Sequence, residues 1–554
     1  MRRLIRYGVI IVAGLLAAAC SSSSPGKTSS TAGNSVLTIS NENGALWTCD
    51  FSPFNGSDTL VSVGFVYEPL VYVNPLQNGA TTPMLATSWS WGASNKTLTF
   101  TIRKNVKFSD GTPLTPNDVV FTFDLLKKYP ALDLTGVWSV LSSVTQTGAD
   151  QVTMDFSAPA VPWFYYIADQ TPIVPAHIWS KISNPVAYPD TDPIGTGPYV
   201  VNPCRASNIT YTANKLYWQP GEPHISTLEY PAFTSNNTAN EELATGQAQW
   251  GAQYIPGIQA FYTSKSPDFH YWFPPVVNVA LIPNLTNPLL SNVLVRQAMA
   301  YAINRPQVST IGESGYEPAA NQAGIVTPTY SGWLDTSALA GYGNYGYDPA
   351  KARQLLAQAG YHLGSDGIMV NSKGQRLQFT VINIGDYSDW VADMQVIAQD
   401  LKAVGIGITP ANLTNTDYDS DLYPGNFQLA YAEQQTIGPG PYYELNDWLN
   451  SADTAPIGKT AATNYERYTN AATQALLDEY AATTSAAAQH SIIDQLEQVM
   501  LAQVPIIPVT EGVDWYQYDT ASFTGWPTAS DPYAQPPVWA YPDNEQVLLH
   551  LRPK

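Results

Sequence analysis

The side chains best suited to chemistry in this 554-residue chain are aromatic and neutral polar ones that gather in four stretches. These are residues 43–54 with Trp47, residues 387–390 with Trp390, residues 434–448 with Tyr442, Tyr443 and Trp448, and residues 511–518 with Trp515 and Tyr516. Flat apolar rings supply contact area, and amides or hydroxyls orient a bound molecule. We therefore predict that these aromatic residues line a ligand-binding cleft.

Sequence patterns of catalytic sites are missing. The chain contains no His-Glu-x-x-His and no Cys-x-x-Cys, and its six histidines form no pair at metal-ligand spacing. The run Gly-Glu-Ser-Gly at 312–315 lacks the spacing of a nucleophile elbow. We therefore expect a protein that is not an enzyme and that uses no cofactor and no metal. One alternative stays open, a secreted cell-surface hydrolase with an aromatic cleft, which would need two facing carboxylates about 5 to 10 Å apart.

Composition restricts the class of partner. The net charge is −20, and only 13% of the residues are charged. A phosphate backbone requires a basic surface, so we expect no nucleic acid partner. The length exceeds what a single hydrophobic core normally serves, which predicts two or more lobes.

The N-terminus has the pattern of a targeting segment. Arg2, Arg3 and Arg6 precede a short apolar run at 8–16, and three alanines precede Cys20. This arrangement resembles a bacterial lipobox, which predicts a signal peptide at 1–19 and a lipid on Cys20. Residues 20–35 then form a flexible tether, and the protein is extracytoplasmic and anchored to the cell membrane. An ordinary signal peptide that is cleaved nearby is the alternative.

Two further cysteines, Cys49 and Cys204, remain in what would be an oxidising compartment. A disulfide between them is the main hypothesis, and two isolated buried thiols are the alternative.

The elements that position these residues are clearest between residues 85 and 128. Leu98, Phe100 and Ile102 alternate with threonines, which predicts a half-buried strand. A turn signal follows at 109–111. Thr115 then suits a helix N-cap, and apolar residues recur behind it at helical spacing.

Several motifs in this order resemble the signature of the family 5 extracytoplasmic solute-binding proteins, the peptide-, nickel- and oligosaccharide-type receptors of bacterial ABC importers. The motifs are Leu-Ala-x-x-Trp at 85–89, Arg-Lys-x-Val-Lys-Phe at 103–108, Asp-Gly-x-Pro-Leu at 110–114, Asp-Val-Val-Phe-x-Phe at 118–123, Gly-Thr-Gly-Pro-Tyr at 195–199 and Val-Arg-Gln-Ala at 295–298. We expect Arg296 in the last motif to form structural ion pairs. We also expect a helix within 59–73 that ends at Pro69, and a last strand at 547–551.

The resemblance implies an α/β fold: a two-lobe, periplasmic-binding-protein-like clam (type II, cluster C) with an extra inserted subdomain. Lobe one would combine residues 36–75, 190–285 and 510–554; residues 76–189 would form its inserted subdomain, and lobe two would be residues 286–509. The protein, expected as a monomer, would capture a solute between the lobes and deliver it to ABC permease subunits.

The ligand class divides between peptide and oligosaccharide. Peptide receptors of the family carry a Trp-x-x-Asp-Tyr-like motif near 429–435, whose acid holds the α-amine. The Asp is missing here, and only Glu433 could replace it. The Gly-Pro-Gly-Pro-Tyr-Tyr run at 438–443 instead resembles the oligosaccharide branch. Both ligands stay open, whereas nickel has no supporting histidine cluster.

Overall fold

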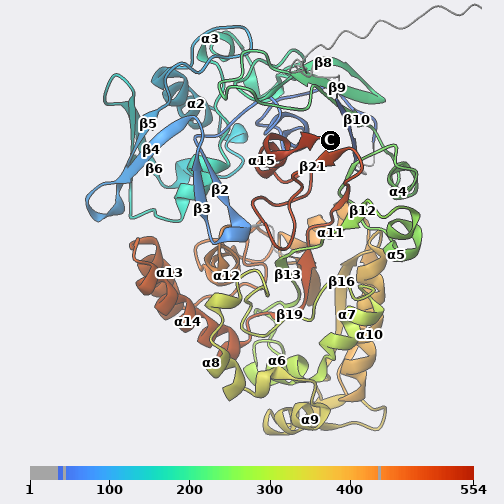
Figure 1. Ribbon diagram of the computed structural model, residues 1–554. Coiled ribbons are helices and arrows are strands. Elements are labelled where there is room, and N and C mark those ends of the chain that lie inside the picture. Colours follow the sequence, from blue (N-terminus) through green and yellow to red (C-terminus); the bar gives the residue numbers. More distant parts are fainter. Residues whose placement is uncertain (1–34, 42–44, 434–437) are drawn as a thin grey trace, which may run out of the picture. The chain divides into compact units, whose positions relative to one another are not determined.

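The structure, a computed structural model, describes residues 35–41, 45–433 and 438–554 (Figure 1). The predictions for the signal peptide at 1–19, the lipid on Cys20 and the tether up to residue 34 concern residues outside this part of the chain. None of the described helices has both the length and the apolar composition that crossing a bilayer requires.

A seven-stranded sheet gathers strands from both ends of the chain. Its order is β12 (Phe269–Tyr271), β20 (Gln517–Asp519), β11 (Trp250–Gly251), β1 (Val36–Ser40), β10 (Thr227–Pro231), β9 (Asn208–Ala213) and β8 (Tyr199–Arg205). The central strand β1 runs parallel to both β10 and β11. Its Leu37 and Ile39 are fully buried, so the first described strand lies in the core of this sheet.

A five-stranded sheet forms a second layer of the fold. Its order is β17 (Gly407–Leu413), β16 (Gln378–Ile384), β18 (Leu429–Glu433), β13 (Pro275–Pro283) and β19 (Ile507–Val513). Strand β13, which the predicted boundaries place in lobe one, pairs with β18 and with β19. Every residue of β13 is buried. A continuously apolar run of this kind does not reveal from sequence which sheet it joins.

A four-stranded antiparallel sheet carries the motif-rich stretch. Its order is β4 (Ala86–Trp91), β5 (Thr97–Ile102), β7 (Gln151–Phe156) and β6 (Leu141–Gln146). Helix α2 (Pro116–Lys128) packs on β6 and β7. The Asp118 carboxylate accepts hydrogen bonds from the backbone N and the Oγ1 of Thr115, both at 2.8 Å. The predicted strand and the predicted helix start are thus confirmed.

The remaining elements surround these sheets. The helices are α1 (Thr59–Ser62), α3 (Ala176–Trp179), α4 (Asn236–Ala244), α5 (Ile258–Phe261), α6 (Val293–Ala302), α7 (Arg305–Ile311), α8 (Thr336–Gly341), α9 (Pro349–Gln358), α10 (Ser388–Ala403), α11 (Asn415–Leu422), α12 (Pro441–Leu449), α13 (Ala471–Ala481), α14 (Ala486–Gln503) and α15 (Asp543–His550). Two-stranded ribbons are β2 (Val71–Asn74) with β3 (Ala80–Pro83), β14 (Tyr361–Leu363) with β15 (Met369–Asn371), and β21 (Phe523–Thr524) with β22 (Arg552–Pro553).

Two element predictions are wrong. Of the helix expected within 59–73, only the four residues of α1 are helical, because the chain turns at Gly64, which has a φ of +80°. A Cβ there would lie 1.8 Å from the Asn544 Oδ1 atom. Residues 547–551, expected as a strand, instead fall largely in α15, in which all but the last residue are buried. A short apolar run fits a buried helix as well as a strand.

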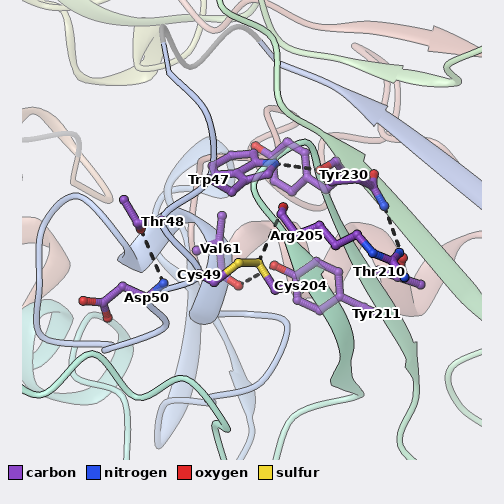
Figure 2. Close-up of a disulfide and its surroundings, with 11 residues drawn as sticks. Trp47, Thr48, Cys49, Asp50, Val61, Cys204, Arg205, Thr210, Tyr211 and Tyr230 are labelled. Carbon is purple, nitrogen blue, oxygen red and sulfur yellow. Dashed lines mark hydrogen bonds between the residues drawn. A yellow bond between two sulfur atoms is a disulfide. The ribbon is translucent and has the colours of Figure 1, made fainter.

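Cys49 and Cys204 form a disulfide, with their Cα atoms 5.8 Å apart (Figure 2). It joins the loop that follows β1 to strand β8. Beside it, the Tyr211 hydroxyl donates to the Val61 carbonyl oxygen at 2.6 Å. The pairing is the one that the sequence analysis favours.

Arg296 has a structural role but forms no ion pair among the described residues. Its guanidinium donates to the carbonyl oxygens of Leu290, Gln503 and Val504 at 2.6–2.7 Å. The expected ion pairing is therefore wrong, because carbonyl groups from the end of α14 take the place of a carboxylate.

Candidate functional site

A cavity of about 430 Å³ lies where the loops of the seven-stranded and five-stranded sheets meet. Tyr254 follows β11, and Asp514 and Trp515 follow β19. Residues 386–390 stand at the start of α10, and Glu433 ends β18. These side chains are distant in sequence, but they line one cavity because the elements that carry them end or begin close together.

Aromatic rings give this cavity a rigid surface. Trp515 is in edge-to-face contact with Phe273 at 4.8 Å and with Tyr254 at 5.1 Å between ring centroids. Trp390 contacts Tyr387 at 5.2 Å in the same geometry. Edge-to-face contacts fix ring orientation, so these surfaces are preformed for a flat or apolar group.

Five carboxyl groups line the same cavity: Glu317, Asp386, Asp389, Glu433 and Asp514. Among the described residues, the lining contains no Lys, Arg or His. Burial raises the pKa of Glu317 and of Asp514 well above the ordinary carboxyl value. The Glu433 side chain is exposed, but desolvation in the cavity wall still raises the pKa of its carboxyl to about 7. The charge of Asp389 is the second cause.

A second carboxyl layer lies behind this wall. Glu313 is fully buried, and desolvation, followed by the charges of Glu317 and Asp393, raises its pKa far above the ordinary value. Burial raises the pKa of Asp393 to about 6, although the Tyr431 hydroxyl donates to its Oδ2 atom at 2.7 Å. Among the described residues, no cation contributes to the pKa of either group, so the pair holds a proton at neutral pH.

A second cavity of about 410 Å³ adjoins the first and shares Asn236, Tyr254 and Trp539 with it. Its other lining residues are Asn41, Leu60, Ala252 and Gln253, so its polar groups are mainly amides. We call the first cavity the acidic chamber and the second the amide chamber.

The structure brings three of the predicted site residues together in the acidic chamber: Trp390, Glu433 and Trp515. Trp47 does not line it. Its Nε1 donates to the Tyr230 carbonyl oxygen at 2.8 Å, and its ring packs on the Tyr230 ring. Trp47 therefore helps to pack the region of the disulfide (Figure 2).

The other four predicted residues do not line the acidic chamber and occupy packed positions. Tyr442 stacks on Tyr480 at 4.1 Å, and the Tyr443 hydroxyl donates to the Pro162 carbonyl oxygen at 2.8 Å. Trp448 is 1% exposed, and Tyr516 is fully buried. Pro441 begins α12, in which nearly every side chain is buried. Residues 434–437 lie outside the described part of the chain.

Sequence reasoning missed Trp539, Asn236 and Glu317. Each is a single residue without a surrounding motif, and each reaches the chambers only through contacts that are distant in sequence. Asp389, by contrast, falls within the second predicted stretch.

Comparison with known proteins gives one family. Residues 80–456 match the sequence model of the bacterial extracellular solute-binding proteins, family 5 (middle region). The glutathione-binding protein GsiB of Escherichia coli K12 is 29% identical over 310 residues, which cover 54% of this chain and 57% of that protein. The chain thus matches little more than half the length of this curated relative.

Solved structures match over nearly the whole chain. The periplasmic oligopeptide-binding protein of an ABC transporter from Thermotoga maritima is 28% identical, with a TM-score of 0.85, covering 94% of this chain and 99% of that one. The same protein with bound mannohexaose matches with a TM-score of 0.78 over the same shares. An oligopeptide-binding protein from Bacillus subtilis, at 19% identity and a TM-score of 0.70, shares the fold. The predicted α/β fold of type II periplasmic binding proteins is confirmed.

Proposed function

The chain belongs to family 5 of the bacterial extracellular solute-binding proteins, and we propose on this basis that it captures a solute outside the cytoplasmic membrane for an ABC importer. The observation that carries the proposal is the aromatic-walled acidic chamber, which is lined by strands of the five-stranded sheet and by Asn236 and Tyr254, which follow strands of the seven-stranded sheet. Closure of the two lobes around a solute, a hinge motion, would present a distinct shape to the permease subunits.

The proposed ligand is an oligomer, either a peptide or an oligosaccharide. Two adjoining chambers of about 430 and 410 Å³ offer room for several units. The Thermotoga relative is described as oligopeptide-binding, and one of its structures holds mannohexaose. Stacking rings and amides suit a sugar, whereas carboxyl groups suit an amine.

The anchor belongs to the same proposal. A lipid on Cys20 would hold the protein at the membrane surface beside its permease. Mass analysis of the protein from its native membrane would detect a diacylglyceryl-modified Cys20 at the N-terminus. A mature chain that begins at another residue, without lipid, would contradict this part.

Thermal unfolding in the presence of ligands tests the function. A ligand at one hundred times its Kd stabilises a folded protein by about 2.7 kcal/mol, so a rise in Tm is expected with oligopeptides or with oligosaccharides. No rise with either class would contradict the proposal. The ligand recovered afterwards should be intact, since shortened products would favour the hydrolase alternative.

A further inference from the structure

A contact between the predicted inserted subdomain and the predicted second lobe lies outside both chambers. On the subdomain side it involves the turn between β4 and β5 and residues 160–166, which follow β7. On the other side it involves helices α12 and α13. These segments contribute no residue to the lining of the acidic or the amide chamber, so the contact serves something other than ligand recognition.

Backbone carbonyl groups at the end of α13 accept two hydrogen bonds from the subdomain. The Val161 N–H donates to the Ala481 carbonyl oxygen at 3.1 Å, and the Asn95 Nδ2 donates to that of Ala482 at 2.9 Å. The Ala160 N–H donates to the Asn95 carbonyl oxygen at 3.2 Å, which holds the two donors next to each other. The last carbonyl groups of a helix have no partner within the helix, so these partners come from a distant part of the fold.

Helix α12 adds a third hydrogen bond and an aromatic contact. The Tyr443 hydroxyl donates to the Pro162 carbonyl oxygen at 2.8 Å. The Tyr443 ring lies edge to face against Tyr165 at 5.4 Å and against Tyr166 at 5.8 Å between ring centroids. Tyr443 is nearly buried, so water competes little for its hydrogen bond.

The subdomain is also fastened to the predicted first lobe. The Ile173 N–H donates to the Glu68 carbonyl oxygen at 3.0 Å. The Gln170 Nε2 donates to the Tyr541 carbonyl oxygen, also at 3.0 Å. Because these bonds hold the subdomain to lobe one, a rotation of lobe two away from lobe one must break the contacts at α12 and α13.

The chain crosses between the two large sheets in two adjacent segments, 272–274 and 514–516. The Asp514 N–H donates to the Pro274 carbonyl oxygen at 2.9 Å, and the Trp272 N–H donates to that of Tyr516 at 3.1 Å. Short crossing segments of this kind can serve as a hinge. The contacts at α12 and α13 do not involve these segments, so they form a second, non-covalent link between the lobes.

We propose that these contacts form a clasp that holds the two lobes together without solute and that opens when the lobes separate. The clasp consists of Asn95, Val161, Pro162, Tyr443, Ala481 and Ala482. The inference rests on the lobe closure of the proposed function but not on the identity of the solute. A solute then meets lobes that are already close together, so less of its binding free energy is used for closure.

The hydrogen-bonding groups of the clasp are all neutral. They are amide, carbonyl and phenol groups, and burial raises the pKa of Tyr443 well above its ordinary value. One neutral hydrogen bond changes an equilibrium by about two- to tenfold. Unlike an ion pair, the clasp should therefore contribute equally at low and at high salt.

The distance between two spin labels on the full-length protein, without solute, tests the proposal. One label replaces Glu241 in α4, which packs on β1, and the other replaces Lys402 in α10, which packs on β16 and β17. Both positions are exposed. Labels carried on non-natural amino acids leave the cysteines unmodified. The parent protein is expected to show mainly one population, at the shorter distance.

Two substitutions weaken the clasp with little change of shape. Tyr443→Phe keeps the ring and removes the hydroxyl, and Asn95→Ala removes the side-chain donor. Together they are expected to raise the ratio of separated to closed lobes about tenfold or more, which gives a second population at longer distance. Tyr442→Phe is the matched control, because the Tyr442 hydroxyl donates to the Asn446 Oδ1 within α12 at 3.4 Å. It should leave the distances unchanged.

The outcomes separate this inference from the proposed function. The same distances in the double variant as in the parent, or a parent that is mainly in the longer-distance population, would refute the clasp. Either result would leave solute capture standing, since no solute is present. An effect that disappears at high salt would also contradict the clasp. If thermal unfolding shows that the double variant does not fold, Tyr443→Phe alone decides, with an expected change of about two- to tenfold. Failure of all peptides and oligosaccharides to bind would refute the proposed function without altering the measured distances.

Discussion

At the scale of single residues, exposure separates two tryptophans that look alike in the sequence. Trp515 is half-buried and presents part of its ring to the acidic chamber. Trp448 is 1% exposed within α12. The first is available to a ligand, whereas the second fills a core position.

Substitution of each tryptophan by alanine should therefore have opposite consequences. Trp515→Ala is expected to weaken ligand binding by about tenfold, because it removes an aromatic contact surface. Trp448→Ala is expected to lower the free energy of unfolding by about 3–5 kcal/mol, because it leaves a cavity in the core, while the affinity of the folded protein is kept. Denaturant unfolding and calorimetry measure the two effects. An unchanged affinity in Trp515→Ala would exclude this ring from the site.

The candidate site was predictable only where a local signal existed. Trp390 and Trp515 belong to short aromatic stretches, which can be recognised in the amino-acid sequence alone. Trp539 and Glu317 have no such setting, and their position depends on which strand ends converge. Tyr442 and Tyr443 follow a Gly-Pro run, and the sequence does not show that they lie in α12, which is buried on nearly all sides.

At the scale of elements, the Gly-Thr-Gly-Pro-Tyr motif marks a place where two backbone segments touch. The Gly197 N–H donates to the Val66 carbonyl oxygen at 2.8 Å, and the Tyr199 N–H donates to that of Phe65 at 2.9 Å. A Cβ on Gly195 would lie 1.9 Å from the Val66 carbonyl oxygen. Glycine is needed here for close approach rather than for phosphate binding.

Gly195→Ala is expected to destabilise the fold by about 1–3 kcal/mol or more, because the backbone of residue 66 must move to admit a methyl group. Gly341→Ala, at the end of α8, meets no atom within 4 Å and serves as the control. It should be neutral or slightly stabilising. Thermal unfolding of both variants measures the difference, and equal Tm values would refute the close-approach explanation.

The elements that were predicted correctly have strong local periodicity or capping, as β5 and α2 do. The last strand, expected at 547–551, was wrong because α15 is buried on nearly all sides. Local pattern reports the face that an element presents to water. For an element that is buried on all sides, the local sequence pattern therefore gives no such information.

At the scale of the whole molecule, two buried arginines are paired with carbonyl oxygens. Arg305, like Arg296, donates to carbonyl oxygens, here those of Pro508, Ala300 and Tyr345. Glu68 and Glu545 are both fully buried, and a carboxyl oxygen of each lies within hydrogen-bond distance of the Tyr217 hydroxyl, at 3.2 and 3.0 Å. Carboxyl groups that are buried without a cation are neutral in the folded protein, so folding is linked to proton uptake.

The sign of this linkage predicts a fold that is most stable in mildly acidic solution. Burial raises the pKa of Glu444 and Asp543 to about 7 and that of Glu497 and Glu511 to about 8. A group whose folded pKa is raised contributes stability that is complete below its unfolded pKa and is lost as the pH rises through the folded value. The Tm is therefore expected to be several degrees higher at pH 5 than at pH 8.5, with the decline spread between pH 5 and about pH 8.

A single substitution tests the origin of this decline. The Glu444 Oε1 accepts from the Asn278 backbone N at 2.7 Å and from its Nδ2 at 3.0 Å, and a glutamine carbonyl can accept the same bonds. Glu444→Gln should therefore raise the Tm at pH 8.5, where the buried glutamate must ionise or stay protonated at a cost, and should change it little at pH 5. Glu479→Gln, which is exposed, should leave the pH profile unchanged. A Tm that rises steadily from pH 5 to pH 8.5 in the parent protein would show instead that the folded state binds fewer protons than the unfolded chain, contrary to the burial of these carboxyl groups.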